Sequence, residues 1–437
     1  MHPRPSFRDS YHSCIILCVA ILVLLAGCDV ALFGNGENAN RRPIATTGEM
    51  PPVQSPVYEN EFANGLFEDA QPATLPVSGE IVIEGGIDYS GDIDLYSLGP
   101  AIAGDQIVVD VTGHGGINTV AALFDGDYNL IDQNNDRSYY GGQIDPYLAQ
   151  VVQRDTPQLY VGIAVSTAVH FASNSGQFPT GAYSIKLTRR NNFATRSARR
   201  QLVWLSFSGG DQVRIALEPL ETMRPFSAES ISDRFAGQSS YIADVLVGRL
   251  RDDLAPFDVV VLDGRHVARP PEEHTTLYFG NYNAAYLGLA DSVDVGNAQL
   301  SQEAIIFSED LASFESLLPT AEETALALAN IAGHELGHLL GLEHSGEAFD
   351  IMATAGSARQ ILENDATYAR SEVESSVFPV GWQNGWDVIA RDIGMNPSGA
   401  ARPKTNHWLP SDSDQSAWRD LAGLPDIPIT ACKKCCG

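Results

Sequence analysis

Three histidines over eleven positions have the clearest chemical capacity in this sequence. They are His334, His338 and His344, in the run His334-Glu335-Leu336-Gly337-His338-Leu339-Leu340-Gly341-Leu342-Glu343-His344. Because His334 and His338 are four residues apart, they face the same side of a helix, and both imidazoles can reach one ion at about 2.0–2.1 Å. Gly341 permits a sharp bend after the helix, since glycine adopts positive φ without a Cβ clash. We expect that bend to bring His344 back as a third ligand.

This donor set is typical of a catalytic zinc site. Three neutral nitrogens leave the fourth zinc position open for water, whereas structural sites are closed by four protein ligands. Glu335 follows the first histidine and is rotated by about 100° around the helix axis, so it would not coordinate the ion. We interpret Glu335 as the general base for zinc-activated water. The alternative, histidines that only pack or face solvent, is disfavoured because five fixed residues at this spacing rarely coincide by chance.

The same run resembles the zinc signature of the metzincin peptidases. Members of that family carry a methionine in a tight turn below the zinc, and Met352 stands eight residues beyond His344. Ser345 and this short interval are most similar to matrixins. The resemblance is strong over 320–355 and weak over roughly 200–319. It implies a metzincin fold, one catalytic Zn²⁺ and hydrolysis of peptide bonds.

The sequence also departs from these families. Ala353 and Thr354 follow Met352, where matrixins usually have Tyr and Pro, and the fifth-ligand Tyr of astacins and serralysins is absent. The structural-zinc loop of matrixins is not recognisable between 264 and 318. Only His266 and His274 occur there, and we assign them no metal and expect them to be exposed. No cysteine lies between Cys28 and the helix, so latency through a cysteine is not supported.

Local patterns around the histidines predict a mixed domain. Thr320 and Glu323 form a capping-box pattern at the start of a helix that continues through Leu340. Apolar residues at helical spacing predict a second helix over 229–254, and a closing helix is expected over 386–393. Strands are expected at 203–207, 257–262 and 304–307. Residues 198–398 are therefore predicted to form an α/β (α+β) zincin catalytic domain.

Residues 79–190 have a different, two-residue rhythm. Apolar side chains alternate with others at 107–111, 159–165 and 183–187, and Gly, Asn and Asp clusters separate the runs. Short alternating strands with such turns predict an antiparallel β-sandwich. The stretches Gly91-Asp92-Ile93-Asp94-Leu95-Tyr96, Ala103-Gly104-Asp105 and Gly181-Ala182-Tyr183-Ser184-Ile185 resemble the bacterial pre-peptidase C-terminal domain. That family consists of small β-sandwiches attached to secreted proteases.

Two further features of this region have open interpretations. The Asp-rich loops at 88–94 and 125–136 offer oxygen ligands for Ca²⁺, but they lack the spacing of a calcium loop, and solvated turns are favoured. The basic stretch from Arg189-Arg190 to Arg199-Arg200 is interpreted as an exposed linker, with a protease-sensitive activation site as the alternative.

The N-terminal residues read as a targeting signal. Arg4 and Arg8 precede an apolar run over 15–26, which is short for a membrane span and suits a signal peptide. The sequence Leu25-Ala26-Gly27-Cys28 resembles a bacterial lipobox, which implies cleavage after residue 27 and diacylation of Cys28. An ordinary secretory signal with an incidental cysteine is the alternative. Residues 28–78, interrupted by prolines, are predicted to be a flexible tether.

Composition sets the remaining limits. The 437 residues include 27 Lys+Arg and 55 Asp+Glu, a net charge of −28 that repels phosphate backbones and argues against nucleic-acid binding. The apolar fraction of 44 % excludes wholesale disorder, and the length predicts several domains. No cysteine lies between 29 and 431, so no disulfide framework is expected there. Residues 399–437 are predicted to be loosely ordered, and disulfide or redox chemistry is favoured over zinc for Cys432, Cys435 and Cys436.

These observations predict a lipid-anchored bacterial zinc metalloendopeptidase outside the cytoplasm, periplasmic or on the cell surface. Its partners would be a protein or peptide substrate and, through Cys28, the membrane. The alternative is a non-catalytic binding lipoprotein with a zincin-like domain, whose sandwich captures a surface ligand. A third hypothesis is hydrolysis of a non-peptide amide by the same metal site.

Overall fold

The computed structural model describes residues 55–60, 64–138, 143–166, 180–215, 221–354 and 356–398. The predicted signal peptide, Cys28 and the predicted tail from 399 lie outside the described residues. Within the described ranges, no helix combines the length and apolar character needed to cross a membrane.

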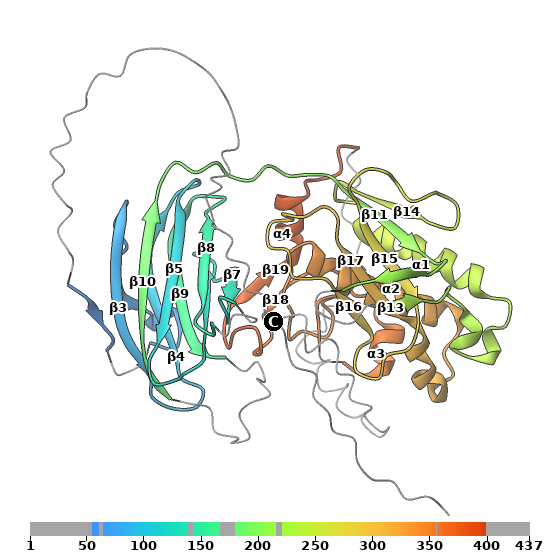
Figure 1. Ribbon diagram of the computed structural model, residues 1–437, viewed down its shortest axis with the longest axis horizontal. Coiled ribbons are helices and arrows are strands. Elements are labelled where there is room, and N and C mark those ends of the chain that lie inside the picture. The colour runs from blue at the N-terminus through green and yellow to red at the C-terminus, as the bar shows by residue number, and fades with distance from the viewer. Residues whose placement is uncertain are drawn as a thin grey trace, which may run out of the picture. The chain divides into compact units, whose positions relative to one another are not determined.

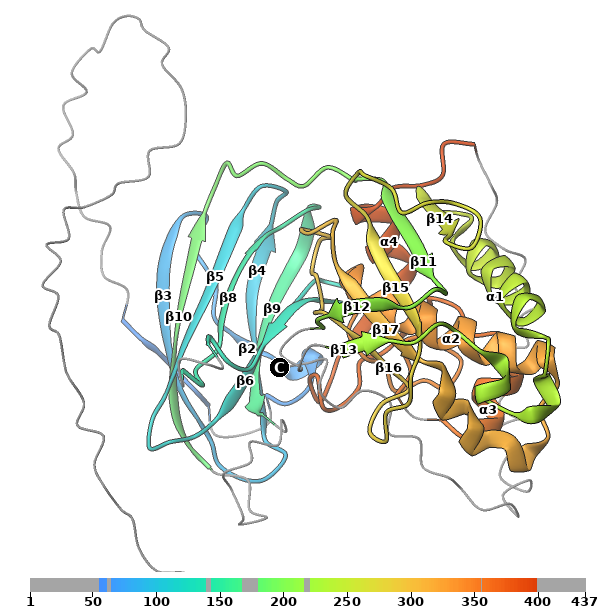
Figure 2. The ribbon, with the colours of Figure 1, turned by 45° about the vertical axis from the view of Figure 1, so that its right-hand side comes forward.

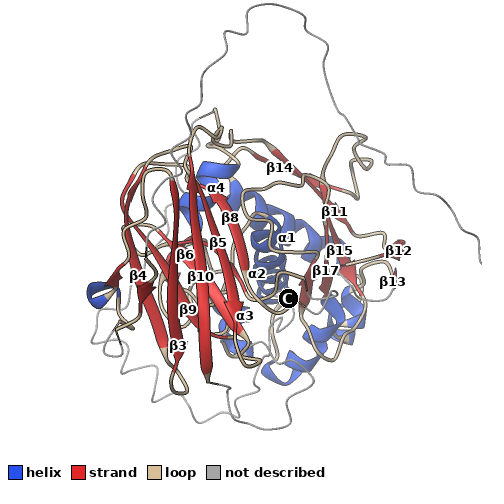
Figure 3. Cartoon of the chain, turned by 60° about the vertical axis from the view of Figure 1, so that its left-hand side comes forward, coloured by secondary structure: helices blue, strands red, loops and turns tan. Residues whose placement is uncertain are grey.

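The N-terminal part is a β-sandwich of two five-stranded sheets (Figures 1 and 3). One sheet has the order β1 (Val57–Tyr58), β3 (Gly79–Ile87), β10 (Gly181–Arg190), β5 (Gln106–Gly113) and β8 (Tyr147–Val151). The other has the order β2 (Gln71–Pro72), β4 (Ile93–Ala101), β9 (Thr156–Val165), β6 (Thr119–Phe124) and β7 (Leu130–Asn134). All neighbours are antiparallel except β1–β3 and β2–β4.

The alternating residues of both sheets form one core. Tyr183, Ile185 and Leu187 of β10 are fully buried and pack in the same cluster as Val161 and Ile163 of β9. This is the packing of two sheets through alternate side chains. The two-residue rhythm seen in the sequence is therefore confirmed as strands with one face in a shared core.

The prediction of a flexible tether up to residue 78 is wrong for its last part. Two short strands, β1 and β2, add to the two sheets, and a 3₁₀ turn (Phe67–Asp69) lies between them. Ala73 and Leu75 are buried in the sandwich core. Pro72 lies in β2 and is tolerated there because β2 is an edge strand, where a missing N–H leaves no ladder bond unmade.

The Asp-rich loops are built as turns. Asp92 accepts a hydrogen bond from the Asp88 amide (2.7 Å), and Asp125 accepts from the amides of Asp127 and Asn129 (2.9 Å each). Among the described residues these loops bring no set of ligand atoms together, so calcium binding gains no support. The carboxylates instead stabilise the local turn conformation.

The basic stretch is only partly a linker. Arg189 belongs to β10, is buried and forms an ion pair with Asp105. Residues 191–200 belong to no helix or strand and are mostly exposed. The segment is nevertheless attached along its length. The Phe193 amide donates to the carbonyl of Gly104 (2.9 Å), the Arg196 amide to Gln153 Oε1 (2.7 Å) and the Arg199 amide to the carbonyl of Asp392 (3.0 Å).

The second sheet-containing region starts at residue 201. Its sheet has the order β14 (Val259–Asp263), β11 (Gln201–Ser206), β15 (Thr275–Gly280), β17 (Glu303–Phe307) and β16 (Gly288–Ala290). The first four strands are parallel, and β16 is an antiparallel edge strand. The three strands expected from the sequence correspond to β11, β14 and β17, whereas β15 and β16 were not predicted.

Two long helices, α1 (Ser239–Leu254) and α2 (Ala321–Leu339), share a hydrophobic core with one face of this sheet (Figure 2). The opposite face carries a smaller cluster that includes the hairpin β12 (Gly210–Val213) and β13 (Glu221–Met223). The predicted helix over 229–254 is wrong for its first ten residues. They form two 3₁₀ turns (Ala228–Ser230 and Asp233–Phe235), and Gly237 has a φ of 75° that ends the turns before α1.

The remaining elements lie before and after α2 in the chain. A 3₁₀ helix (Ser308–Leu317) precedes it, and α3 (Ala358–Glu363), β18 (Arg370–Glu372), β19 (Trp382–Asn384) and α4 (Gly385–Asp392) follow it. The capping box of α2 is present, because Thr320 Oγ1 accepts from the Glu323 amide and Glu323 accepts from the Thr320 amide. The predictions of this helix and of the closing helix α4 are confirmed.

Candidate metal centre

Three imidazoles converge at the C-terminal end of α2. His334, His338 and His344 are 6 %, 0 % and 3 % exposed. His338 Nε2 lies 3.2 Å from His334 Nε2 and 3.1 Å from His344 Nε2. Nitrogens bound at about 2.0–2.1 Å to one tetrahedral ion would be about 3.4 Å apart. The three atoms therefore surround a space that fits a single ion.

The hydrogen bonds of the rings fix which nitrogen carries the proton. His334 Nδ1 is 2.9 Å from the carbonyl of Ile351, and His338 Nδ1 is 2.7 Å from that of Leu342. Because a carbonyl only accepts, both Nδ1 atoms donate, and both Nε2 atoms present bare lone pairs. Two lone pairs at 3.2 Å repel each other and do not form a hydrogen bond. A cation between them removes this repulsion, so the donor set fits Zn²⁺.

Burial keeps these rings neutral. It lowers the pKa of His334 to about 4 and of His338 to about 3, and it lowers that of His344 as well. The neighbouring imidazoles act in the same direction on His338 and His344. Neutral imidazole is the form that ligates a metal, so the site is ready to bind at neutral pH.

The bend that returns His344 has the expected cause. Gly341 has a φ of 91°, and a Cβ there would lie 2.8 Å from the carbonyl of Asp294. After this residue the Leu342 amide donates back to the carbonyl of Gly337, 2.9 Å away. A side chain at 341 would thus be strained and crowded, and the chain would not turn back at this point.

Glu335 lies beside the three rings under the edge strand β16. It is 2 % exposed, and its Oε2 has no hydrogen-bond partner among the described residues. A Cβ at Gly288 would lie 2.4 Å from Glu335 Oε1, so glycine leaves room for the carboxylate. Burial raises the pKa of Glu335 to about 8, against an opposing effect of the Ala290 amide. A bound dication would favour the charged form.

Met352 lies in a tight turn directly under the histidines. Its amide donates to Asp350 Oδ1 (3.1 Å), and its carbonyl accepts from the Ser345 amide (2.9 Å). The side chain is fully buried against α2, where a Cβ at Gly337 would lie 2.3 Å from Met352 Sδ. The glycine between the two helical histidines therefore lets the methionine turn approach the helix.

We expect Gly337→Ala to lower the melting temperature and to weaken zinc binding, because the added methyl displaces the turn that carries Met352. Gly248→Ala in α1 is the matched control. No heavy atom lies within 4 Å of a Cβ at that exposed helical position, so alanine should stabilise by about 0.5–1 kcal/mol. Thermal unfolding and zinc titration test both variants. A Gly337→Ala chain as stable as Gly248→Ala contradicts the contact.

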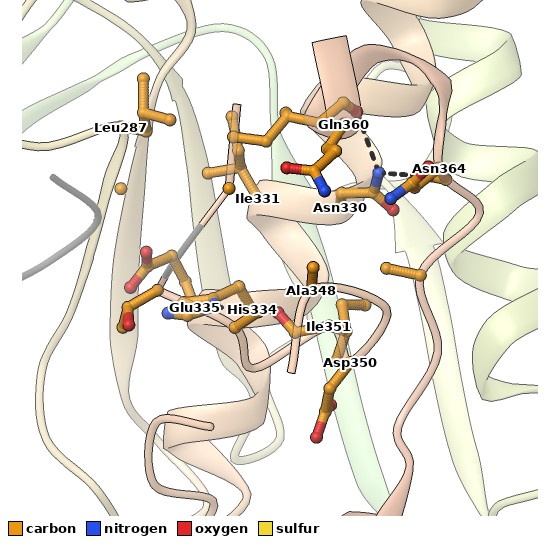
Figure 4. A pocket seen from close by; sticks show the side chains of 16 residues that line it. Leu287, Asn330, Ile331, His334, Glu335, Ala348, Asp350, Ile351, Gln360 and Asn364 are labelled. Carbon is orange, nitrogen blue, oxygen red and sulfur yellow. Dashed lines mark hydrogen bonds between the residues drawn. The ribbon is translucent and has the colours of Figure 1, made fainter. Parts of the chain in front are cut away.

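An apolar pocket opens beside His334 and Glu335. In Figure 4 these two residues lie at one side of the pocket, and Asn330, Gln360 and Asn364 lie at another. The Asn330 side chain donates to the carbonyls of Ile361 (3.1 Å) and Asn364 (2.8 Å), which fixes the turn after α3. The apolar lining includes Leu287, Ile331, Ile351, Ile361 and Ala366. The pocket suits a substrate side chain that is mainly apolar.

A second group of potential ligands is formed by Asp244, Asp263 and His266. Arg265 already provides the positive charge there, with its Nη2 2.7 Å from Asp244 Oδ1 and 2.6 Å from Asp263 Oδ2. The His266 side chain is 71 % exposed, as expected. The expectation that His274 is also exposed is wrong, because its ring is half-buried and accepts a hydrogen bond from Arg269 Nε (2.9 Å).

The sequence analysis missed several residues around the centre. Gly337 carried a usable signal, because a glycine inside a helix often marks a close approach of another segment. Gly288 in β16 and Gln383 in β19 carried no such signal in the sequence. Their positions depend on strands that pair across long stretches of chain. Ala353 and Thr354, which replace the usual Tyr and Pro of matrixins after Met352, both line the pocket.

One family model covers the metal-binding region of this chain. The family model described as Matrixin matches residues 274–368, which include the three histidines and Met352. No curated protein matches the chain. The archaemetzincin structure from Methanopyrus kandleri is 15 % identical and covers 40 % of this chain and 92 % of its own, with a TM-score of 0.24.

Two further solved structures show weak similarity to parts of the chain. The pre-peptidase C-terminal domain of a Bacillus anthracis collagenase is 16 % identical and covers 28 % of this chain and 94 % of its own (TM-score 0.19). PliG from Aeromonas hydrophila, titled a periplasmic inhibitor of g-type lysozyme, is 13 % identical. Its structure covers 31 % of this chain and 100 % of its own, with a TM-score of 0.21. Similarities this weak support no statement about activity. The Matrixin match and the converging histidines together support a metzincin-like domain in this chain.

Proposed function

We propose that the chain is a zinc-dependent endopeptidase. One observation carries the proposal: three neutral imidazoles present Nε2 atoms to a common point, and the buried carboxylate of Glu335 lies beside them. His334, His338 and His344 would hold the ion. When bound there, zinc supplies a Lewis acid that polarises a carbonyl and makes water more acidic.

Glu335 would act as the general base. Its Oε2 has no partner among the described residues and is available to take the proton from water as the water attacks the scissile carbonyl. The same oxygen can then deliver this proton to the leaving amine. The bonds of His334 and His338 to backbone carbonyls keep both rings in the tautomer that ligation requires.

Two features favour a peptide substrate over another amide. β16 is an edge strand of the sheet, and Gly288 within it lies against the Glu335 carboxylate. An extended peptide can add to such an edge through backbone hydrogen bonds, which would place its peptide bonds in front of Glu335. The adjacent apolar pocket would then accept a side chain next to the cleaved bond.

The site of action is a second part of the proposal. The run Leu25-Ala26-Gly27-Cys28 after an apolar segment supports lipidation of Cys28 and anchoring outside the cytoplasm. Mass spectrometry of the N-terminal peptide from bacterial membranes tests it. Cys28 should be the first residue and carry acyl groups; an unmodified Cys28 contradicts lipid anchoring.

Digestion of a broad peptide library by the full chain tests the activity. We expect cleavage next to apolar residues, loss of cleavage with a chelator, and recovery when zinc is added back. Cleavage that survives complete zinc removal contradicts the metal mechanism. If zinc binds but no peptide is cut, the non-catalytic binding alternative is favoured, and turnover of a non-peptide amide alone would favour the third hypothesis.

A further inference from the structure

The third histidine lies in an irregular segment that is held from two sides. The Ser345 amide donates to the carbonyl of Met352, and Ser345 also bridges to Val373. The Glu374 amide donates to the carbonyl of His344 (3.0 Å). His334 and His338 are fixed by α2 itself, whereas the position of His344 depends on the later segment 370–384. We call this segment the β18–β19 hairpin.

A buried glutamine of this hairpin clamps the backbone of Glu343, the residue before His344. Gln383 Oε1 accepts from the Glu343 amide (2.7 Å), and Gln383 Nε2 donates to the Glu343 carbonyl (2.9 Å). Gln383 is 3 % exposed. Two bonds in opposite directions fix both the position and the orientation of this backbone unit. A displacement of the hairpin would therefore move His344 with it.

The other side of the hairpin is built into the β-sandwich. Val373 and Phe378 belong to a buried cluster whose remaining members come from the sandwich, namely Leu95, Val120, Ala122, Phe124 and Ala164. The Trp382 amide donates to the carbonyl of Tyr128 (3.0 Å), and Arg370 donates to Asn129 Oδ1 (3.0 Å). The hairpin thus contacts the sandwich through apolar packing, one backbone hydrogen bond and one hydrogen bond between side chains.

Two glycines allow this packing, one on each side. A Cβ at Gly162 in β9 would lie 2.7 Å from Phe378 Cζ. A Cβ at Gly381 in the hairpin, where φ is 113°, would lie 2.4 Å from Phe124 Cε1. The rings of Phe124 and Phe378 are 5.4 Å apart, in an edge-on arrangement. The ring of Phe378 therefore fits because residue 162 is glycine, and the ring of Phe124 fits because residue 381 is glycine.

The sandwich also reaches the metal-binding run directly. Gln133 of β7 donates from Nε2 to Glu343 Oε1, 2.9 Å away. Glu343 is 5 % exposed and immediately precedes His344. A hydrogen bond to a buried carboxylate is stronger than one between neutral groups, so Gln133 stabilises this conformation of the run.

We propose that the β-sandwich is a positioning part of the metal centre: through the β18–β19 hairpin and Gln133 it sets the place of His344. This inference rests on the proposed zinc site but goes beyond the proposed activity. It gives the sandwich a role inside the catalytic unit, different from the capture of a surface ligand.

Zinc affinity of the full chain and the visible spectrum of its cobalt(II) form test this inference. We expect Phe378→Ala and Gly162→Ala each to weaken zinc binding by about 10–100-fold, the range typical of residues that orient metal ligands, and to alter the cobalt bands. In the double variant the two losses should be less than additive, because the ring that the Gly162 methyl would strike is absent.

Two controls match these variants. Gly86→Ala adds a methyl to β3 of the same sandwich, where the nearest heavy atom to the new Cβ is 3.6 Å away. Phe235→Ala removes a buried ring from the core shared by α1 and α2. Both should keep zinc affinity within about twofold and leave the cobalt spectrum unchanged, even where the melting temperature falls.

Gln133 variants keep the test decisive if Phe378→Ala does not fold. Gln133→Ala should weaken zinc binding several-fold, and Gln133→Glu should weaken it further because two carboxylates would then face each other. Unchanged zinc affinity and cobalt spectrum in both Gln133 variants overturn the inference while the proposed function stands. A wild-type chain that binds no zinc overturns the proposed function and this inference together.

Discussion

Glu335→Gln should lower peptide hydrolysis by at least about 10²–10⁴-fold while the chain still binds one zinc ion. Glutamine has nearly the shape of glutamate, so it fits the space under Gly288. Its amide cannot take a proton from water, which removes the base. The three imidazoles do not depend on Glu335 for their hydrogen bonds, so the metal should remain. Turnover of a cleaved library peptide and zinc analysis are the two measurements.

Glu322→Gln is the matched control for this variant. Glu322 is exposed in the first turn of the same helix, where its carboxylate accepts a hydrogen bond from Tyr241. The same chemical change there should leave turnover within about twofold. Full activity in Glu335→Gln would exclude Glu335 as the base. Loss of zinc together with activity would instead show that Glu335 contributes to the metal site itself.

The parts of the site that could be predicted from the sequence are those with local causes. The capping box at Thr320 starts α2, the four-residue spacing places two histidines on one face, and Gly341 supplies the positive φ that returns the third. Each of these depends on residues within a few positions of one another. The position of Met352 also has a local cause. It stands only eight residues after His344, and its turn packs directly on α2.

The missed parts depend on contacts between distant segments. In the sequence Gln383 has no feature that marks it as part of the site. Its role comes from the hydrogen bond that it accepts from the Glu343 amide, forty residues earlier in the chain. Phe378 reads as a core residue, and nothing in the sequence pairs it with Gly162. The helix expected from 229 is wrong for a related reason. Ile231 and Phe235 have the apolar spacing of a helix and are buried, but they lie in or beside 3₁₀ turns. The spacing of buried residues alone does not distinguish an α-helix from successive 3₁₀ turns.

His338→Ala should remove nearly all zinc binding. His338 is the middle ligand, with its Nε2 about equally close to those of His334 and His344, and it is fully buried. Its removal leaves only two imidazole ligands, His334 and His344, so we expect zinc content to fall from one ion per chain to a small fraction. Metal analysis after dialysis against micromolar zinc measures this loss.

Thermal unfolding with and without zinc gives a second readout that does not depend on activity. Zinc at a thousandfold excess over its dissociation constant should stabilise the wild-type fold by about 4 kcal/mol, and chelation should remove that increment. In His338→Ala the melting temperature should be the same with zinc and with chelator. The substitution also removes the hydrogen bond from His338 Nδ1 to the Leu342 carbonyl, which lowers the melting temperature both with zinc and with chelator. The difference between the two melting temperatures of one variant therefore reports zinc binding alone.

His266→Ala and His274→Ala are the controls that locate the ion. His266 belongs to the group with Asp244 and Asp263, where Arg265 already supplies the positive charge, and His274 pairs with Arg269. Both variants should keep one zinc and the zinc-dependent rise in melting temperature. If His266→Ala loses the metal and His338→Ala retains it, the ion binds beside Arg265, and the three converging imidazoles have another role. Because His338 has no solvent exposure and the His266 side chain is mostly exposed, we expect the opposite result.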